Sequence, residues 1–145
     1  MDKIQQTEKN FKDGCNCCQA VILSYAKELG MNDTEILRLG SLFGGGFGKL
    51  REVCGAVSGM TMIAGLIKGY DNLTDQQIKQ EAYSLERKLA EKFKERHGSI
   101  ICREILENQK IEQNSNNKTG HTSTSCIECV KTATELLEKE IFDRK

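Results

Sequence analysis

Cysteine is the residue type best suited to chemistry in this sequence, which has 145 residues and seven cysteines. They are Cys15, Cys17, Cys18, Cys54, Cys102, Cys126 and Cys129. Thiolates attack disulfides and peroxides, and they bind zinc, copper and iron–sulfur clusters. Because seven is an odd number, the cysteines cannot all pair within one chain. We therefore expect metal ligands, redox groups or small buried residues rather than a framework of structural disulfides.

Charge and hydropathy narrow the range of functions further. The chain has 21 Lys+Arg and 21 Asp+Glu, which argues against a dedicated nucleic-acid-binding protein because such proteins carry a basic surplus. The longest run without charge, Val53–Ile67, is too short to span a membrane. No apolar segment typical of a secretory signal occurs near the N-terminus. We expect a cytoplasmic protein without a membrane span, in which thiols are kept reduced.

The elements that position the cysteines are predicted to be helices. The sequence has no proline, and no segment alternates convincingly with period two. Capping pairs such as Asn16 with Gln19 mark helix starts. Apolar periodicity and glycine stops place helices at 4–12, 19–29, 33–43, 50–68, 75–97, 99–106 and from 125 onward. We predict an all-α fold: a single domain over residues 1–145, forming a compact bundle of about six or seven helices.

Three segments have distinctive composition. Val53–Ile67 is apolar or small on every face and rich in Gly and Ala, so we expect a buried central helix, inside the bundle or in a homodimer interface. Residues 107–124 are rich in Asn, Gln, Ser, Thr and Lys, and predict a mobile polar loop. The glycine run Gly44–Gly48 predicts a tight turn or a close approach to the functional site.

Four cysteines lie near the predicted starts of four separate helices. They are Cys17, Cys54, Cys102 and Cys126. Free N–H groups and the macrodipole at a helix N-terminus lower the pKa of a thiol and stabilise its thiolate. Burial in the core is the alternative explanation for each of them, because cysteine is among the most buried residue types. Whether the four helix starts converge in space is left open by the sequence.

Five segments of the sequence together resemble a known family. They are Gly14-x-Asn16-Cys17-x-Gln19-Ala20-Val21, Phe43-Gly-Gly-Gly-Phe-Gly48, Cys54-Gly55-Ala56-x-x-Gly59, Cys102-Arg103-Glu104 and Cys126-x-x-x-Val130. The chain closely resembles the CGAxxG family (pattern C_GCAxxG_C_C), four-cysteine proteins of about this length to which redox activity is ascribed. The resemblance covers nearly the whole chain. It implies that the family's four cysteines are Cys17, Cys54, Cys102 and Cys126, the same four that lie near helix starts.

The same resemblance bears on the cofactor. A related helical domain accompanies haem in some multidomain cytochromes, where an iron–sulfur centre is implied. No Cys-x-x-Cys-His motif for haem attachment occurs in this sequence, so the cytochrome context does not transfer.

The chain departs from the family pattern at Cys15, Cys18 and Cys129. An aromatic and a small residue are expected at the first two positions, and an aromatic is usual at the third. The extra thiols create two Cys-x-x-Cys pairs, Cys15/Cys18 and Cys126/Cys129. Substituting Ser for Cys15 or Cys18 is expected to have almost no effect on metal or redox activity, and release of the metal by either variant would favour the paired zinc site.

The leading hypothesis is a metal site formed by the four family cysteines. It would most readily hold an iron–sulfur cluster for electron transfer or redox sensing with an unidentified redox partner protein. One alternative is a metal-free thiol–disulfide protein in which Cys126 and Cys129 form the reactive pair. Another is a structural zinc site made from the two Cys-x-x-Cys pairs. A helical interaction domain with cysteines used only for packing stays open, and so does whether the chain is an enzyme.

The two histidines are weaker candidates. His97 ends a predicted helix, where the C-terminal dipole favours the cation and predicts a solvated cap rather than a ligand. His121 lies in the polar loop, before Cys126, and is a minor candidate for a fourth ligand or a base.

Overall fold

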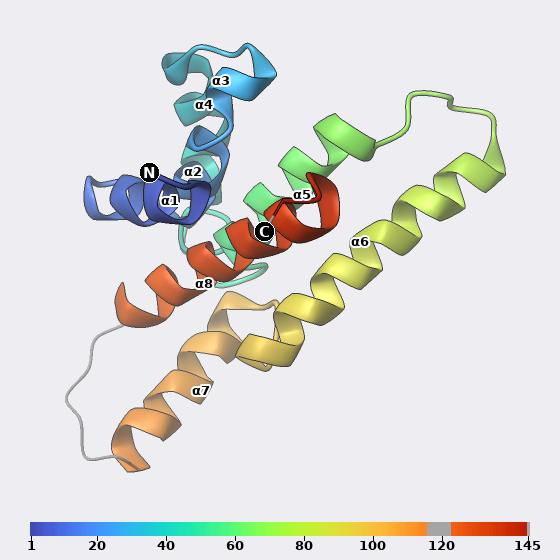
Figure 1. Ribbon diagram of the computed structural model, residues 1–145. Helices are drawn as coiled ribbons and strands as arrows, with labels where there is room; N and C mark the ends of the chain where they lie inside the picture. Colours follow the sequence, from blue (N-terminus) through green and yellow to red (C-terminus); the bar gives the residue numbers. More distant parts are fainter. Residues whose placement is uncertain (116–122, 145) are drawn as a thin grey trace.

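Capping residues and glycine stops divide the chain into helices. The computed structural model describes residues 1–115 and 123–144 (Figure 1). The α-helices are α1 (Lys3–Lys12), α2 (Cys17–Leu23), α3 (Ala26–Leu29), α4 (Asp33–Gly40), α5 (Gly55–Lys68), α6 (Gln76–His97), α7 (Cys102–Ser115) and α8 (Ser123–Leu136). A 3-10 turn, η1 (Ser41–Phe43), extends α4, and a π-helical turn, η2 (Leu137–Ile141), extends α8. Across these described ranges the isolated bridge between Val53 and Ile101 is the only β pairing, and the all-α fold is confirmed.

Local sequence explains most helix boundaries. The predicted capping box opens α2: the N–H of Gln19 donates to the Asn16 side chain at 2.8 Å, and the N–H of Asn16 donates to the Gln19 side chain at 3.0 Å. Gly30 and Gly98 end α3 and α6 in the left-handed conformation. The side chain of Asp75 caps α6. These are contacts among residues a few positions apart, which is why the pattern of the sequence predicts them.

The predicted helix over 19–29 is two helices in the structure. α2 ends at Leu23, where the hydroxyl of Ser24 donates to the carbonyl of Ala20 at 3.3 Å and lies 2.7 Å from the hydroxyl of Thr7. Hydrogen bonding of a Ser side chain to the preceding turn bends a helix. The chain resumes as the single turn α3. This division is one reason why the described residues contain eight α-helices rather than the predicted six or seven.

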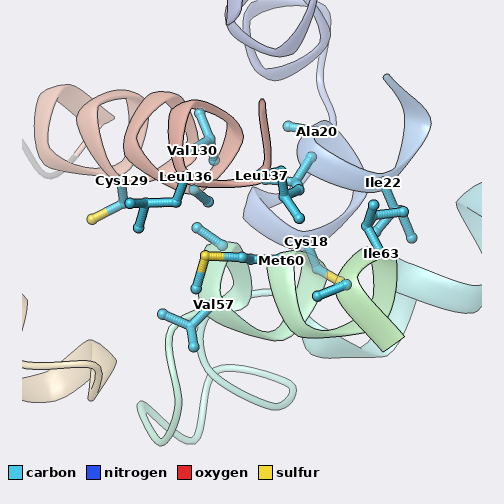
Figure 2. Packing of buried hydrophobic residues seen from close by; sticks show 14 of the residues in the cluster. Cys18, Ala20, Ile22, Val57, Met60, Ile63, Cys129, Val130, Leu136 and Leu137 are labelled. Carbon is cyan, nitrogen blue, oxygen red and sulfur yellow. The ribbon is translucent and has the colours of Figure 1, made fainter. Parts of the chain in front are cut away.

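Helix α5 is the centre of the hydrophobic core. It packs against α2 and α8 (Figure 2). The buried residues along it are Gly55, Ala56, Val57, Gly59, Met60, Ile63 and Ala64. At Gly59 a Cβ atom would lie 3.0 Å from the carbonyl oxygen of Cys18 and 3.1 Å from the Cβ of Val21, so glycine permits the close approach of α2. The predicted buried Gly/Ala-rich helix is confirmed over this part of the segment.

Both ends of this segment differ from the prediction. The helix begins at Gly55 rather than near residue 50, because the residues before it adopt left-handed conformations that a right-handed helix cannot contain. Those with φ between 56° and 73° are Gly45, Gly46, Phe47, Gly48, Lys49 and Arg51. The glycine run therefore forms the tight turn that its composition predicted. At the other end Leu66 and Ile67 are 59% and 41% exposed, so the buried part of α5 ends before them.

Helix α7 is longer than the sequence predicted. It continues to Ser115, so residues 107–115 of the predicted polar loop are helical. The prediction is wrong there because Asn and Gln lower helix propensity only modestly and no Gly or Pro interrupts the stretch. Residues 116–122 of the predicted loop lie outside the described residues, and α8 begins at Ser123.

The longest helix, α6, runs beside α5 and α8 and leads into α7 (Figure 1). On the other side of the core, α1 packs against α2 and α8, and α4 packs against α2. Within the described ranges, no helix combines the length and the apolar character that a bilayer span requires.

Candidate functional site

Six cysteines line one cavity. Its volume is about 250 Å³, and the six are Cys15, Cys17, Cys54, Cys102, Cys126 and Cys129. Phe11, Ile105 and Leu106 form apolar walls, and Lys49 and Arg51 also line it. No Asp or Glu is among the described residues of the lining. The cavity therefore combines thiols and positive charge in an apolar surrounding.

Four of these cysteines come from the starts of four helices. Cys17 is the first residue of α2, Cys54 is the N-cap of α5, and Cys102 is the first residue of α7. Cys126 lies in the first turn of α8, which begins two residues earlier than predicted. The structure thus brings together the four cysteines that the sequence pattern singled out, and it adds Cys15 and Cys129 to them.

Backbone hydrogen bonds hold the Cys54 and Cys102 segments side by side. The N–H of Cys54 donates to the carbonyl of Ile100 at 2.8 Å, and the N–H of Cys102 donates to the carbonyl of Glu52 at 2.6 Å. The glycine turn packs on the same segment, since a Cβ at Gly46 would lie 2.9 Å from the Cβ of Cys102. The glycine turn therefore forms part of the wall of the cysteine-lined cavity.

The pKa values of Cys17 and Cys126 depend on each other. Hydrogen bonding from Cys17, helped by the positive charge of Arg51, lowers the pKa of Cys126 to about 7. The same contact, together with burial, raises the pKa of Cys17 well above its usual range. Cys126 is therefore the more acidic of the two thiols.

The pKa values of Cys54 and Cys129 also depend on each other. Hydrogen bonding from Cys129, and from the backbone N–H groups of Ala56 and Val57, lowers the pKa of Cys54 against the opposing effect of burial. The contact and burial together raise the pKa of Cys129. Cys54 is thus the more acidic member, because the N-terminus of α5 supplies it with two additional donors.

Arg51 is a site residue that the sequence did not identify. Its Nη1 lies 3.7 Å from the sulfur of Cys102, in donating geometry. Burial raises the pKa of Cys102, and the guanidinium of Arg51 acts in the opposite direction. A single arginine after a glycine run matches no sequence motif. The contact of Arg51 with Cys102 depends on the left-handed turn, in which Arg51 has a φ of 64°, and only the structure shows it.

Cys15 and Cys18 have different surroundings. Cys18 does not line the cavity: it is fully buried in the core, where burial raises its pKa to about 12. Cys15 does line the cavity, and partial burial raises its pKa more modestly. This Cys-x-x-Cys pair therefore does not present two sulfurs to one site, as a paired zinc centre requires.

His97 is half-buried rather than solvated. Its ring lies against Phe93, with centroids 4.6 Å apart, and its Nε2 is 2.9 Å from the hydroxyl of Thr132. Burial and the charge of Arg96 lower its pKa, so the neutral ring is favoured. The predicted cationic cap is wrong because the end of α6 packs against α8. His121 lies outside the described residues.

The donor set suits a soft metal centre. Thiolates are the usual ligands of iron–sulfur clusters and of structural zinc, and clusters are further tuned by N–H groups and by the polarity of their surroundings. In the part of the chain that the structure describes, no group of three or more His, Cys, Asp or Glu side chains has the spacing to hold a metal ion. The argument that this cavity suits a metal centre therefore depends on the chemistry of the thiols and on their presence in one cavity.

The fold and the site define an all-α protein whose cysteines meet at the starts of four helices. Residues 15–140 match the family described as "Putative redox-active protein (C_GCAxxG_C_C)", and the chain belongs to this family. The match confirms the resemblance seen in the sequence and supports redox activity as the class of function. No curated protein and no solved structure matches the chain.

Proposed function

We propose that the protein binds an iron–sulfur cluster through the sulfurs of Cys17, Cys54, Cys102 and Cys126 and uses it for electron transfer or redox sensing. The observation that carries the proposal is the convergence of these four thiols, from four helices, on one cavity of about 250 Å³. Four cysteine thiolates are the standard ligand set of such clusters. The family to which the chain belongs is described by the same four-cysteine pattern.

The surrounding residues have definite roles in this proposal. A cluster supplies reversible one-electron chemistry when bound. Arg51 offsets part of the negative charge of the thiolates, since its guanidinium lies beside Cys102 and lowers the pKa of Cys126. The apolar side chains of Ile105 and Leu106 limit contact with water, which is one of the factors that set the reduction potential.

The first experiment is anaerobic purification and reconstitution with iron and sulfide, followed by a visible spectrum and iron, zinc and sulfide analysis of one sample. We expect iron and sulfide in comparable amounts in the wild type. Cys54→Ala is expected to lower the iron content about tenfold or more, since one ligand is lost, and to leave helix content largely intact. Cys15→Ser is the matched control, because Cys15 lines the same cavity but is outside the family pattern.

A wild-type protein with neither iron nor zinc would overturn the cluster proposal. Zinc without iron would favour a structural site instead. Equal iron in wild type and Cys54→Ala would exclude the proposed ligand set.

A second candidate function is metal-free thiol–disulfide chemistry. It is favoured by the adjacent thiols of Cys17 and Cys126, since a thiol with a pKa of about 7 is a good nucleophile near neutral pH. The partner in this reading is Cys17, from another helix, rather than Cys129 on the same helix. A colourless protein that reduces a small disulfide substrate, and loses this activity on Cys126→Ser, would support it.

A further inference from the structure

We propose that the glycine turn, residues 42–51, is the docking surface for a small acidic protein that exchanges one electron with the metal site. The electron transfer rests on the proposed function, whereas the docking itself needs no metal. Three features of the turn carry the proposal: its place at the cavity, its exposed apolar side chains and its positive charge.

The turn forms one wall of the cysteine-lined cavity. Gly45, Gly46, Lys49 and Arg51 all line it. A Cβ at Gly46 would lie 2.9 Å from the Cβ of Cys102, and Nη1 of Arg51 lies 3.7 Å from the sulfur of Cys102. A protein bound to this turn is therefore close to the proposed ligands, as electron transfer requires.

Large apolar side chains are exposed on the same turn. Leu42, Phe47 and Leu50 are 80%, 44% and 68% exposed. Backbone hydrogen bonds connect their positions: the N–H of Gly48 donates to the carbonyl of Leu42 at 2.9 Å, and the N–H of Leu50 donates to that of Phe47 at 3.0 Å. Apolar side chains exposed together and flanked by polar residues are typical of protein–protein contact sites. These three side chains form the apolar centre of the proposed surface.

The backbone of the turn is held in a costly conformation. Phe47, Lys49 and Arg51 have φ of 65°, 66° and 64°, in the left-handed region that residues other than glycine rarely adopt. The N–H of Lys49 donates to the carbonyl of Gly44 at 2.9 Å, and the N–H of Arg51 donates to that of Gly45 at 3.0 Å. Strain of this kind concentrates at functional sites, and a surface fixed before binding loses less entropy when a partner binds.

The charge of the turn specifies the partner. Residues 36–51 contain three basic residues and no acidic one, and the first acidic residue after them, Glu52, pairs with Arg103. Lys49 and Arg51 are exposed, and neither pairs with a carboxylate among the described residues. An acidic surface complements this charge and is steered toward it. A second copy of the chain would instead bring like charges together across a two-fold axis.

The size of the surface suits a carrier that binds and leaves quickly. Electron-transfer complexes are small, at less than about 1,200 Å² of buried surface, and short-lived. In the proposed step one electron passes from the reduced carrier to the oxidised metal site, and no covalent bond forms or breaks. The reverse transfer uses the same surface.

The test of docking uses the full-length protein, isotope-labelled, reduced and metal-free. It is titrated separately with flavodoxin and with a plant-type ferredoxin, which are small acidic one-electron carriers, and with cytochrome c, a basic one. Nuclear magnetic resonance is expected to show shifts of the backbone N–H groups of residues 42–51 with an acidic carrier and none there with cytochrome c. Affinity is expected to fall about tenfold from low to high salt, because salt screens the charges.

Two leucine variants provide a matched comparison. Leu50→Glu places an acidic group within the proposed surface, whereas Leu73→Glu places one in the segment between α5 and α6. Both leucines are strongly exposed, at 68% and 72%, so neither change disturbs the core. Leu50→Glu is expected to weaken binding of the acidic carrier about tenfold or more, and Leu73→Glu is expected to bind as the wild type does. Lys49→Gln is expected to weaken binding less and to reduce its dependence on salt.

Three results would overturn the docking proposal. The first is a turn whose N–H signals move with neither flavodoxin nor ferredoxin. The second is equal binding by Leu50→Glu and Leu73→Glu. The third is a wild-type dimer, seen by light scattering, that Leu50→Glu dissociates, because this face would then bind a second copy of the chain.

Electron transfer is measured separately, on the protein reconstituted with iron and sulfide. Stopped-flow mixing with the reduced acidic carrier is expected to give a rate about tenfold lower for Leu50→Glu than for Leu73→Glu at equal iron content and low carrier concentration. Equal rates despite weakened binding would overturn the link between this surface and the metal site. If the wild type takes up no iron, the proposed function fails, whereas the titration still decides whether the turn is a docking surface.

Discussion

Cys17 and Cys18 are neighbours in the chain, yet their side chains have different surroundings. Cys17 lines the cavity, whereas Cys18 is fully buried in the core. Successive residues of a helix point about 100° apart, so adjacent cysteines of α2 face different neighbours. At the residue scale, helix phase decides whether a thiol of this chain is available for chemistry or serves as a packing residue.

This difference predicts unequal effects of serine substitution. Cys18→Ser is expected to lower the free energy of unfolding by about 1–3 kcal/mol, because a hydroxyl would be buried without a partner. Cys15→Ser, at a partly exposed position, is expected to change it by less than about 0.5 kcal/mol. Urea unfolding followed by circular dichroism measures both. Equal midpoints for the two variants would contradict the burial argument.

Among the elements, α5 does most to organise the molecule, and its glycines differ in what they contact. Gly59 lies against α2, where no room remains for a Cβ beside Cys18 and Val21. Gly65, two turns further on, is exposed and has no atom within 4 Å of the position of a Cβ. The same residue type therefore has a packing role at one end of the helix and none at the other.

Alanine substitution separates these two cases. Gly59→Ala is expected to destabilise the protein by about 1–3 kcal/mol through overpacking against α2. Gly65→Ala is expected to stabilise it by about 0.5–1 kcal/mol, because alanine has the higher helix propensity and meets no obstacle. Thermal and urea unfolding of both variants provide the measurement. If Gly59→Ala stabilised the protein, α2 and α5 could move apart without loss of stability, and the packing argument would be wrong.

For the whole molecule, the attachment of α6 to α8 joins the long helix to the rest of the fold. Two lysines of α6, Lys88 and Lys92, form ion pairs with Glu140, with N–O distances of 3.0 and 3.3 Å. Exposed pairs of this kind contribute little to stability. The buried side chains of Leu89 and Phe93 and the His97–Thr132 hydrogen bond are therefore expected to contribute more to the attachment than these ion pairs do.

The attachment is expected to depend on pH through His97. Its pKa is lowered in the folded protein from a reference value of 6.5, so the unfolded chain binds more protons as the pH falls through that range. The contribution of neutral His97 to the free energy of unfolding is complete above about pH 6.5 and is lost progressively below it. Comparing urea unfolding of wild type and His97→Gln between pH 5 and 8 isolates this effect, because other groups cancel in the difference.

His97→Gln is expected to cost about 0.5–1.5 kcal/mol at pH 7.5 through the weakened contact with Thr132, and less at acidic pH. A difference between the two proteins that does not change with pH would contradict the buried, neutral assignment of His97.

Local signals explain which parts of this structure were predictable. The capping box of Asn16 and Gln19 and the glycine ends of α3 and α6 involve residues within a few positions of one another. The extension of the left-handed turn to Arg51 and the continuation of α7 were not predicted, because backbone conformation there depends on packing as well as composition. The four cysteines of the family pattern were identified because each lies beside a helix start.

The sequence by itself determined the all-α class, the approximate positions of the helices and the four cysteines that define the family, since caps, periodicity and motifs are local. Only the tertiary structure decided that six cysteines line one cavity and that Arg51 lies beside Cys102. These residues come from segments far apart in the chain. Their proximity depends on how the core around α5 packs, which no local pattern encodes.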